Sequence, residues 1–251
     1  MIYVISLGGS ILVPEEINIG FLRKFKNLIL KEINKNKKFI IIVGGGKTAR
    51  KYQEVAKKLT KISNEHFYDP FKNAMVCYTG LLKKESVKIF NEDLDWLGIH
   101  ATRINAHLLL TIFRKYAYYR IIKNPKEKVN FKEKILIAAG WKPGFSTDYD
   151  AVLLAKTYKS DTVINLTNVD YVYDKDPNKF KNAQPLKEIN WKDYLKLIEN
   201  KWIPGMSAPF DPIASKIAQK FGIKCIIING NKLNEFQRFL EGRKFRGTVI
   251  K

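Results

Sequence analysis

The chain has 251 residues, a length that allows one large α/β core or two small ones. Hydrophobic residues make up 45% of it, as in ordinary globular proteins, and no apolar run approaches the ~18 residues of a membrane-spanning helix, so we expect no membrane partner. The amino-terminal residues carry no basic segment and no small-residue cleavage site, so we expect a mature protein. Cys77 and Cys225 each lie in an apolar stretch, so we expect core thiols in a reducing, cytoplasmic compartment.

The formal net charge of +21 is the one unusual global property. Such an excess is compatible with a nucleic acid or another polyanion as partner. The lysines, however, are scattered beside many Asn, Ile, Phe and Tyr residues, and no basic run reaches five or six residues. We therefore favour solvated surfaces over a nucleic-acid partner and keep RNA binding as an alternative. In either case the charge would attract phosphate-bearing substrates.

Two strands that end in glycine-rich turns dominate the first part of the chain. Residues 2–7 are short, apolar and β-branched and stop at Gly8-Gly9-Ser10, and residues 39–43 stop in the same way at Gly44-Gly45-Gly46. Continuous apolar runs of this kind predict strands that are buried on both faces. Helical spacing of apolar residues predicts helices over 18–34, capped by Asn18, and over 47–59.

The same alternation returns in the second half. Strands are predicted at 134–139, 162–166, 224–228 and 247–250, and helices at 148–158, 191–199, 211–221 and 232–240. Strands separated by helices predict an α/β fold, a three-layer αβα sandwich with a central, mostly parallel sheet. No low-complexity linker interrupts the series, so we expect one domain over 1–251. Residues 61–91 are irregular, which leaves open a loop, an inserted helical hairpin or an oligomer contact.

Three of the predicted strands end in glycine-rich turns, the third at 140–144. Glycine lets backbone N–H groups approach a phosphate without interference from Cβ, and a helix that follows adds its positive end. Two familiar motifs are excluded. A P-loop ending at Gly46 needs glycine where Ile41 stands, and no G-x-G-x-x-G follows the first strand.

Two further segments carry polar groups suited to a nucleotide. In residues 144–150, Ser146 or Thr147 can cap the next helix, and Asp148 either complements the helix dipole or orients a cation or a basic side chain. Residues 167–177 bring polar, aromatic and acidic side chains directly after a strand, where they could hold a nucleoside. Alone, the second segment would pass as an acidic turn.

Together these segments resemble the amino-acid kinase superfamily and, within it, the uridylate (UMP) kinases of archaeal type. The resemblance rests on six motifs in the family's order over nearly the whole chain. They are Ser6-Leu-Gly-Gly-Ser10, residues 44–52, residues 95–106, Pro143-Gly-Phe-Ser-Thr-Asp148, residues 167–177 and residues 211–218.

The resemblance implies ATP and UMP as ligands, with Mg²⁺ as cofactor. For ATP it implies phosphate contacts from Gly8, Gly9, Ser10, Gly46 and Arg50, and nucleoside contacts from Thr167, Asn168, Tyr173 and Asp176. For UMP it implies Gly45, Asp95, Trp141, Lys142, Pro143, Gly144, Phe145, Ser146 and Thr147. It also implies a homo-oligomer, a hexamer built from dimers. No residue is assigned as a resident metal ligand.

The activity that this resemblance implies is in-line transfer of the ATP γ-phosphoryl group to UMP, with Lys47, Arg50 and Asp148 as catalytic residues. Bacterial members have a lysine where Ser6 stands, so Lys47 or Mg²⁺ would carry more of the charge here. Two alternatives remain: a non-catalytic nucleotide-binding or storage relative, and an enzyme of the same superfamily with a different acceptor.

Overall fold

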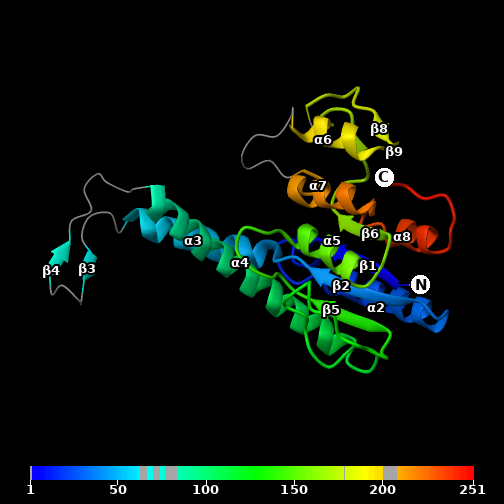
Figure 1. The fold of residues 1–251 in the computed structure, drawn as a ribbon, viewed down its shortest axis with the longest axis horizontal. Coiled ribbons are helices and arrows are strands. Elements are labelled where there is room, and N and C mark those ends of the chain that lie inside the picture. Colours follow the sequence, from blue (N-terminus) through cyan, green and yellow to red (C-terminus); the bar gives the residue numbers. More distant parts are fainter. Residues whose placement is uncertain (1, 63–66, 70–73, 77–83, 178, 200–207) are drawn as a thin grey trace.

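The computed structural model describes residues 2–62, 67–69, 74–76, 84–177, 179–199 and 208–251. A seven-stranded sheet in the order β5-β2-β1-β6-β10-β11-β9 forms its centre (Figure 1). The strands are β1 (Ile2–Leu7), β2 (Lys38–Val43), β5 (Ile135–Ala138), β6 (Thr162–Thr167), β9 (Glu188–Ile189), β10 (Lys224–Asn229) and β11 (Thr248–Ile250). All neighbouring strands pair in parallel except β10 and β11. The predicted α/β class and mostly parallel sheet are therefore confirmed.

Helices cover both faces of this sheet. One face packs against α2 (Ile19–Asn34), the carboxyl-terminal half of α4 (Lys84–Ile112) and α8 (Leu233–Leu240). The other face packs against α5 (Thr147–Thr157), α6 (Trp191–Glu199) and α7 (Pro212–Phe221). The side chains of the central strands alternate between these two cores, as for Ile5 and Val4 in β1, because successive strand residues point to opposite faces. This alternation produces the predicted αβα layers.

Local signals in the sequence place the ends of several helices. Asn18 accepts a hydrogen bond from the Phe21 N–H at the start of α2, and Ser146 accepts one from the Tyr149 N–H at the start of α5. Asp211 caps α7, which begins at Pro212. These side chains satisfy amide groups that the first helical turn leaves free. The predicted strands and helices outside the irregular segment are confirmed, with boundaries shifted by up to three residues.

The helix α4 was missing from the sequence-based prediction. It runs antiparallel beside α3 (Gly46–Ile62), and the two extend away from the sheet as a long hairpin (Figure 1). Apolar residues of α4 occur on more than one side, since Leu109 is buried while Ile104 is exposed, so its periodicity is weak. Of the predicted irregular segment 61–91, the structure describes the end of α3, β3 (Phe67–Asp69), β4 (Ala74–Val76) and the start of α4.

The remaining elements are small. A four-residue helix, α1 (Gly9–Leu12), follows β1, and β7 (Val172–Tyr173) pairs with β8 (Pro185–Leu186). The prediction of one domain stays a prediction; in its support, β1 lies in the middle of the same sheet as β10 and β11. No helix in the described parts of the chain is long and apolar enough to span a membrane. Cys225 is buried, as predicted, and Cys77 lies outside the described residues.

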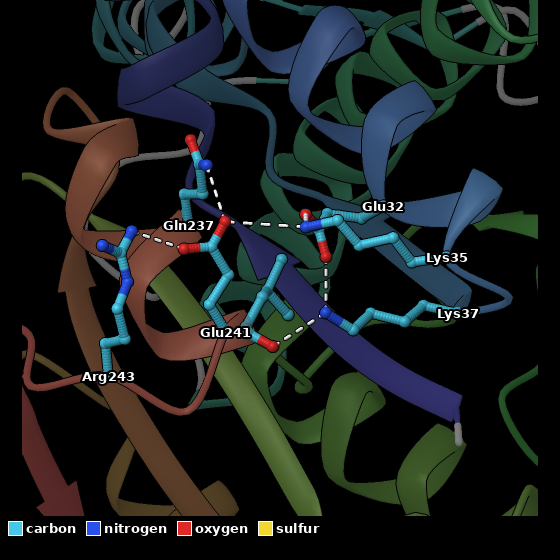
Figure 2. Close-up of polar contacts among 7 residues, drawn as sticks. Glu32, Lys35, Lys37, Gln237, Glu241 and Arg243 are labelled. Atoms are coloured by element: carbon cyan, nitrogen blue, oxygen red, sulfur yellow. Dashed lines mark hydrogen bonds and ion pairs between the residues drawn. The ribbon is translucent and has the colours of Figure 1, made fainter.

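A corner formed by α2 and α8 holds a dense ionic network, shown in Figure 2. Glu32 is completely buried, and its two carboxylate oxygens pair with Lys35 at 2.7 Å and with Lys37. Lys37 also donates to the Leu240 carbonyl oxygen at 2.7 Å, which joins α2 to the end of α8. Because both carboxylate oxygens of Glu32 are paired, removal of either charged partner would leave a buried charge uncompensated and would be costly.

Candidate nucleotide site

The first two glycine turns lie backbone against backbone at the carboxyl edge of the sheet. A Cβ atom on Gly9 would stand 2.1 Å from the Gly46 nitrogen, and one on Gly44 would stand 2.6 Å from the Gly9 nitrogen. No side chain fits at such distances. Gly46 also has a φ of +63°, in the left-handed region that favours glycine. The glycines are therefore required by the contact between the turns, and they place two sets of backbone amides beside each other.

Helix α4 ties the third turn to the other two. The Thr102 hydroxyl oxygen accepts a hydrogen bond from the Gly140 N–H at 2.9 Å, and the Asn105 side-chain amide donates to the Gly44 carbonyl at 2.8 Å. Both side chains are buried. Sequence reasoning included Thr102 and Asn105 in a nucleotide segment but gave them no role. Their burial had no clear signal in the sequence, because the helix that carries them was not predicted and its apolar periodicity is weak.

The loop that follows β5 forms an aromatic ladder. The Trp141 and Phe145 rings stack with centroids 5.7 Å apart, and the Phe145 and Tyr149 rings stack at 4.4 Å. The Lys142 ammonium lies 4.5 Å from the centre of the Trp141 ring. The loop turns at Gly144, whose φ is +82° and whose N–H donates to Asp95 at 2.8 Å. The structure thus brings Asp95 together with Gly144 of the predicted acceptor loop, in which Pro143 precedes the turn and Thr147 begins α5.

Asp148 lies at the point where α5, β1 and α7 meet. One carboxylate oxygen accepts from the Ser6 hydroxyl at 2.8 Å, and the other accepts from the Asp211 N–H at 3.3 Å. Desolvation raises the pKa of Asp148 to about 6, and the nearby Asp211 carboxylate adds to that rise. Ser6, the partner of Asp148, lies two residues before Gly8 of the first glycine turn. Mg²⁺ prefers one or two carboxylates together with phosphate oxygens, and Asp148 and Asp211 are an oxygen donor set of that kind.

The predicted cationic residues lie at the start of α3. The Lys47 ammonium pairs with Glu15 at 3.3 Å, whereas the described contacts of Asp148 are to Ser6 and Asp211. Lys47 and Asp148 therefore have different partners in the structure. Arg50 lies one turn further along α3 and is exposed. Ser10 is in the short helix α1, next to the Gly9 contact.

The predicted ATP nucleoside segment follows β6, the neighbour of β1. Gly8 donates to the Leu166 carbonyl at 2.9 Å, so Thr167 and Asn168 begin directly beside the first glycine turn. Tyr173 lies further on in β7 and contacts Tyr171 edge to face at 6.2 Å. Asp176 lies in the turn after β7, where its carbonyl accepts from the Phe180 N–H at 2.9 Å. The printed contact of Tyr173 is to Tyr171, in the same segment and not in a glycine turn.

The opposite edge of the sheet carries a separate depression of about 480 Å³, lined by residues that include Trp191 and Lys224. Lys224 begins β10, whereas the glycine turns follow the last residues of their strands, so this depression is not part of the candidate site. Among the described residues no group of three or more His, Cys, Asp or Glu side chains could hold a metal ion.

An open α/β sheet with adjoining glycine turns at its carboxyl edge defines a class of protein that binds anionic ligands there. The particular family follows from comparison. The model of the amino acid kinase family matches residues 1–229, and the chain belongs to this family.

The relatives narrow the comparison further. The chain is 32% identical over 250 residues to a uridylate kinase of Thermococcus sibiricus, with 98% of both chains covered. It is 33% identical over 231 residues to a uridylate kinase of Methanococcus aeolicus, with 90% of both covered. The crystal structure of uridylate kinase from Archaeoglobus fulgidus is 27% identical and superimposes over 100% of both chains with a TM-score of 0.75. The resemblance predicted from the sequence motifs is confirmed.

Proposed function

We propose that the protein transfers the γ-phosphoryl group of ATP to the phosphate of UMP and so forms ADP and UDP. One observation carries this proposal. Similarity to uridylate kinases at 32% identity spans 98% of the chain and includes both glycine turns, and these turns lie in backbone contact. A transfer between two phosphorylated ligands requires such adjoining anion sites.

The geometry supports catalysis by position and charge. Phosphoryl transfer needs little covalent chemistry from the protein, and the acceptor is already an anionic phosphate oxygen, so no general base is required. For ATP we assign phosphate contacts to the backbone of the first two turns and to the start of α3, where helix amides and Arg50 favour negative charge. For UMP we assign Gly45, Asp95 and residues 141–147, because Asp95 already contacts the loop at Gly144.

Lys47 is assigned to the transferring phosphoryl group. Its present partner, Glu15, is 71% exposed, and such a surface pair contributes only about 0–1 kcal/mol. A phosphate group with two or more charges would therefore displace Glu15 at little cost. If Lys47→Ala retained the turnover of the wild type, this role would be wrong.

Mg²⁺ is assigned to Asp148, with Asp211 beside it, and when bound it would neutralise charge on the ATP phosphates. Asp148 is held for this task by Ser6 and by the Asp211 N–H. At pH 7.5 a carboxyl with a pKa of about 6 is mostly ionised, as a metal ligand must be.

We also propose a homo-oligomer, a hexamer built from dimers, in the cytoplasm. In support, Tyr52, Val55 and Leu59 are between 55% and 63% exposed and repeat along one side of α3. Light scattering after gel filtration is expected to show an assembly that Val55→Glu weakens, and a monomeric wild type would contradict the proposed oligomer.

The buried free thiol of Cys225 suits the reducing environment of the proposed cytoplasmic location.

The test is an ADP-release assay with UMP, CMP and acetylglutamate as separate acceptors. We expect turnover that is largest with UMP and depends on Mg²⁺. Release only with acetylglutamate would identify an enzyme with another acceptor, and ATP binding without any release would identify a non-catalytic relative. RNA binding that is tight, falls steeply with salt and resists nucleotide competition would favour the RNA alternative.

A further inference from the structure

The main chain of Trp141 is fixed on both sides by the side chains of Asp150 and Arg103. Its N–H donates to Asp150 Oδ2 at 3.0 Å, and its carbonyl oxygen accepts from Arg103 Nη2 at 3.5 Å. Asp150 belongs to α5 and Arg103 to α4. Trp141, the second residue of the third glycine turn, is therefore held between two helices that lie far apart in the sequence.

Both of these side chains keep a buried polar atom without a hydrogen-bond partner among the described residues. The atoms are Asp150 Oδ1 and Arg103 Nε, and Asp150 is 0% exposed. Such atoms are costly and rare in folded proteins, so each needs an explanation. Packing alone does not supply one, since an apolar side chain would fill the position of Asp150 without this cost. The contact that its carboxylate gains in return is the one to Trp141.

Trp141 in turn orders the predicted acceptor side. Its ring is the first of the aromatic ladder, with Phe145 stacked beside it and the Lys142 ammonium above it. A shift of the Trp141 main chain would move the ring, the ladder and the loop that reaches Asp95 through Gly144. A misplacement of substrate-binding groups by about 1 Å can lower the efficiency of an enzyme by a large factor.

We propose that Asp150, together with Arg103, is a positioning residue for the acceptor nucleotide. It acts through the Trp141 main chain and touches no substrate itself. This inference rests on the proposed function, in which residues 141–147 bind UMP.

Steady-state kinetics with Asp150→Ala and Asp150→Asn tests the proposal. Alanine removes the acceptor of the Trp141 N–H, so we expect the KM for UMP to rise about tenfold while kcat and the KM for ATP change less than twofold. Asparagine keeps an oxygen that can accept, so we expect its KM for UMP to stay within about threefold of the wild type. The matched control is Glu235→Gln. Glu235 lies in α8, is buried and accepts a hydrogen bond from the Arg246 N–H at 2.8 Å.

Two results would overturn the proposal. One is a parallel rise of both KM values in Asp150→Ala, and the other is a fall of kcat alone. Each would mean that Asp150 acts on the whole fold or on the chemical step. If Asp150→Ala did not fold, Arg103→Met would take its place, with the same expected rise in the KM for UMP and the same overturning results.

A readout without turnover separates this inference from the proposed function. Acrylamide quenching of tryptophan emission is measured in nucleotide-free protein, and a Trp141→Phe counterpart of each variant isolates the Trp141 signal. We expect Trp141 to become more accessible in Asp150→Ala or Arg103→Met and unchanged in Asp150→Asn and Glu235→Gln. Unchanged quenching in the first two would reject the positioning role. Inactivity of the wild type with UMP, with the expected quenching intact, would reject only the proposed function.

Discussion

Glu32 in α2 and Asp150 in α5 are both completely buried carboxylates, yet their surroundings have opposite effects. Burial alone would raise the pKa of Glu32, but hydrogen bonds from Lys35 and Lys37 outweigh it and hold that pKa below its usual value (Figure 2). At Asp150, desolvation dominates and raises the pKa to about 7, because the Trp141 N–H compensates only part of it.

The difference separates two uses of buried charge within one fold. The α2–α8 corner pairs every charge on Glu32 and joins two helices. At the glycine-turn edge, Asp150 Oδ1 and Arg103 Nε have no hydrogen-bond partner among the described residues. The carboxylate of Asp148 also lies near a second carboxylate, that of Asp211. Unfavourable arrangements of this kind are kept where a ligand or a reaction uses them. Variants in the two regions should therefore affect different measurements.

The largest effect is expected at Asp148. Asp148→Asn keeps the shape of the side chain but removes its charge, so kcat for UMP phosphorylation should fall by about 10²–10³-fold. The melting temperature should not fall, because a carboxyl with a raised pKa gains nothing from ionising at neutral pH. Turnover within fivefold of the wild type would contradict the role of Asp148.

Glu32→Gln should lower the stability of the fold and leave UMP phosphorylation unchanged. It leaves Lys35 and Lys37 without their charged partner, and it should lower the free energy of unfolding by roughly 2–3 kcal/mol, less than for a fully buried pair because both lysines reach water. Urea unfolding at pH 7.5 measures this. Both KM values should stay within twofold, and a selective change in either would break the separation between the two regions.

The effect of Asp150→Asn on stability depends on pH. A carboxyl whose folded pKa of about 7 lies above its unfolded value favours folding while protonated, and this contribution is lost as pH rises from about 4 to 7. Asparagine does not titrate, so the variant should be more stable than the wild type by up to about 4 kcal/mol at pH 8 and no more stable at pH 4. Thermal unfolding at both pH values measures the difference.

Glu32 should show the opposite pH dependence. Its lowered pKa gives a contribution to stability that is present above about pH 4.5 and is lost as pH falls through the folded pKa.

For Asp150→Asn, a stability difference from the wild type that did not change between pH 4 and pH 8 would mean that Asp150 is not held near its neutral form.

Local signals in the sequence predicted the sheet, and the predicted site residues stay a prediction. Apolar runs that stop at glycine predicted β1 and β2. Asn18 predicted the start of α2, and of the two candidate caps for α5, Ser146 and Thr147, the structure has Ser146. Burial of Glu32 also had a local signal, since it lies three residues after Ile29 and four after Leu28, on the apolar side of α2.

Contacts between distant segments were beyond that reasoning. The pairing of Lys47 with Glu15, the two hydrogen bonds of Asp148 and the clamp on Trp141 each depend on how separate elements pack. The close contact that leaves no room for a side chain at Gly9 or Gly46 also depends on packing, because the sequence shows two glycine turns but not their contact. The chemistry of the site therefore needed the structure.

The central claim is that adjoining glycine turns hold ATP and UMP side by side. Calorimetric titration with an adenosine and a uridine joined through five phosphates tests it most directly. The account predicts one molecule bound per chain, more tightly than either nucleotide, and displaced by both ATP and UMP. Displacement by only one of them, or two molecules bound per chain, would contradict it.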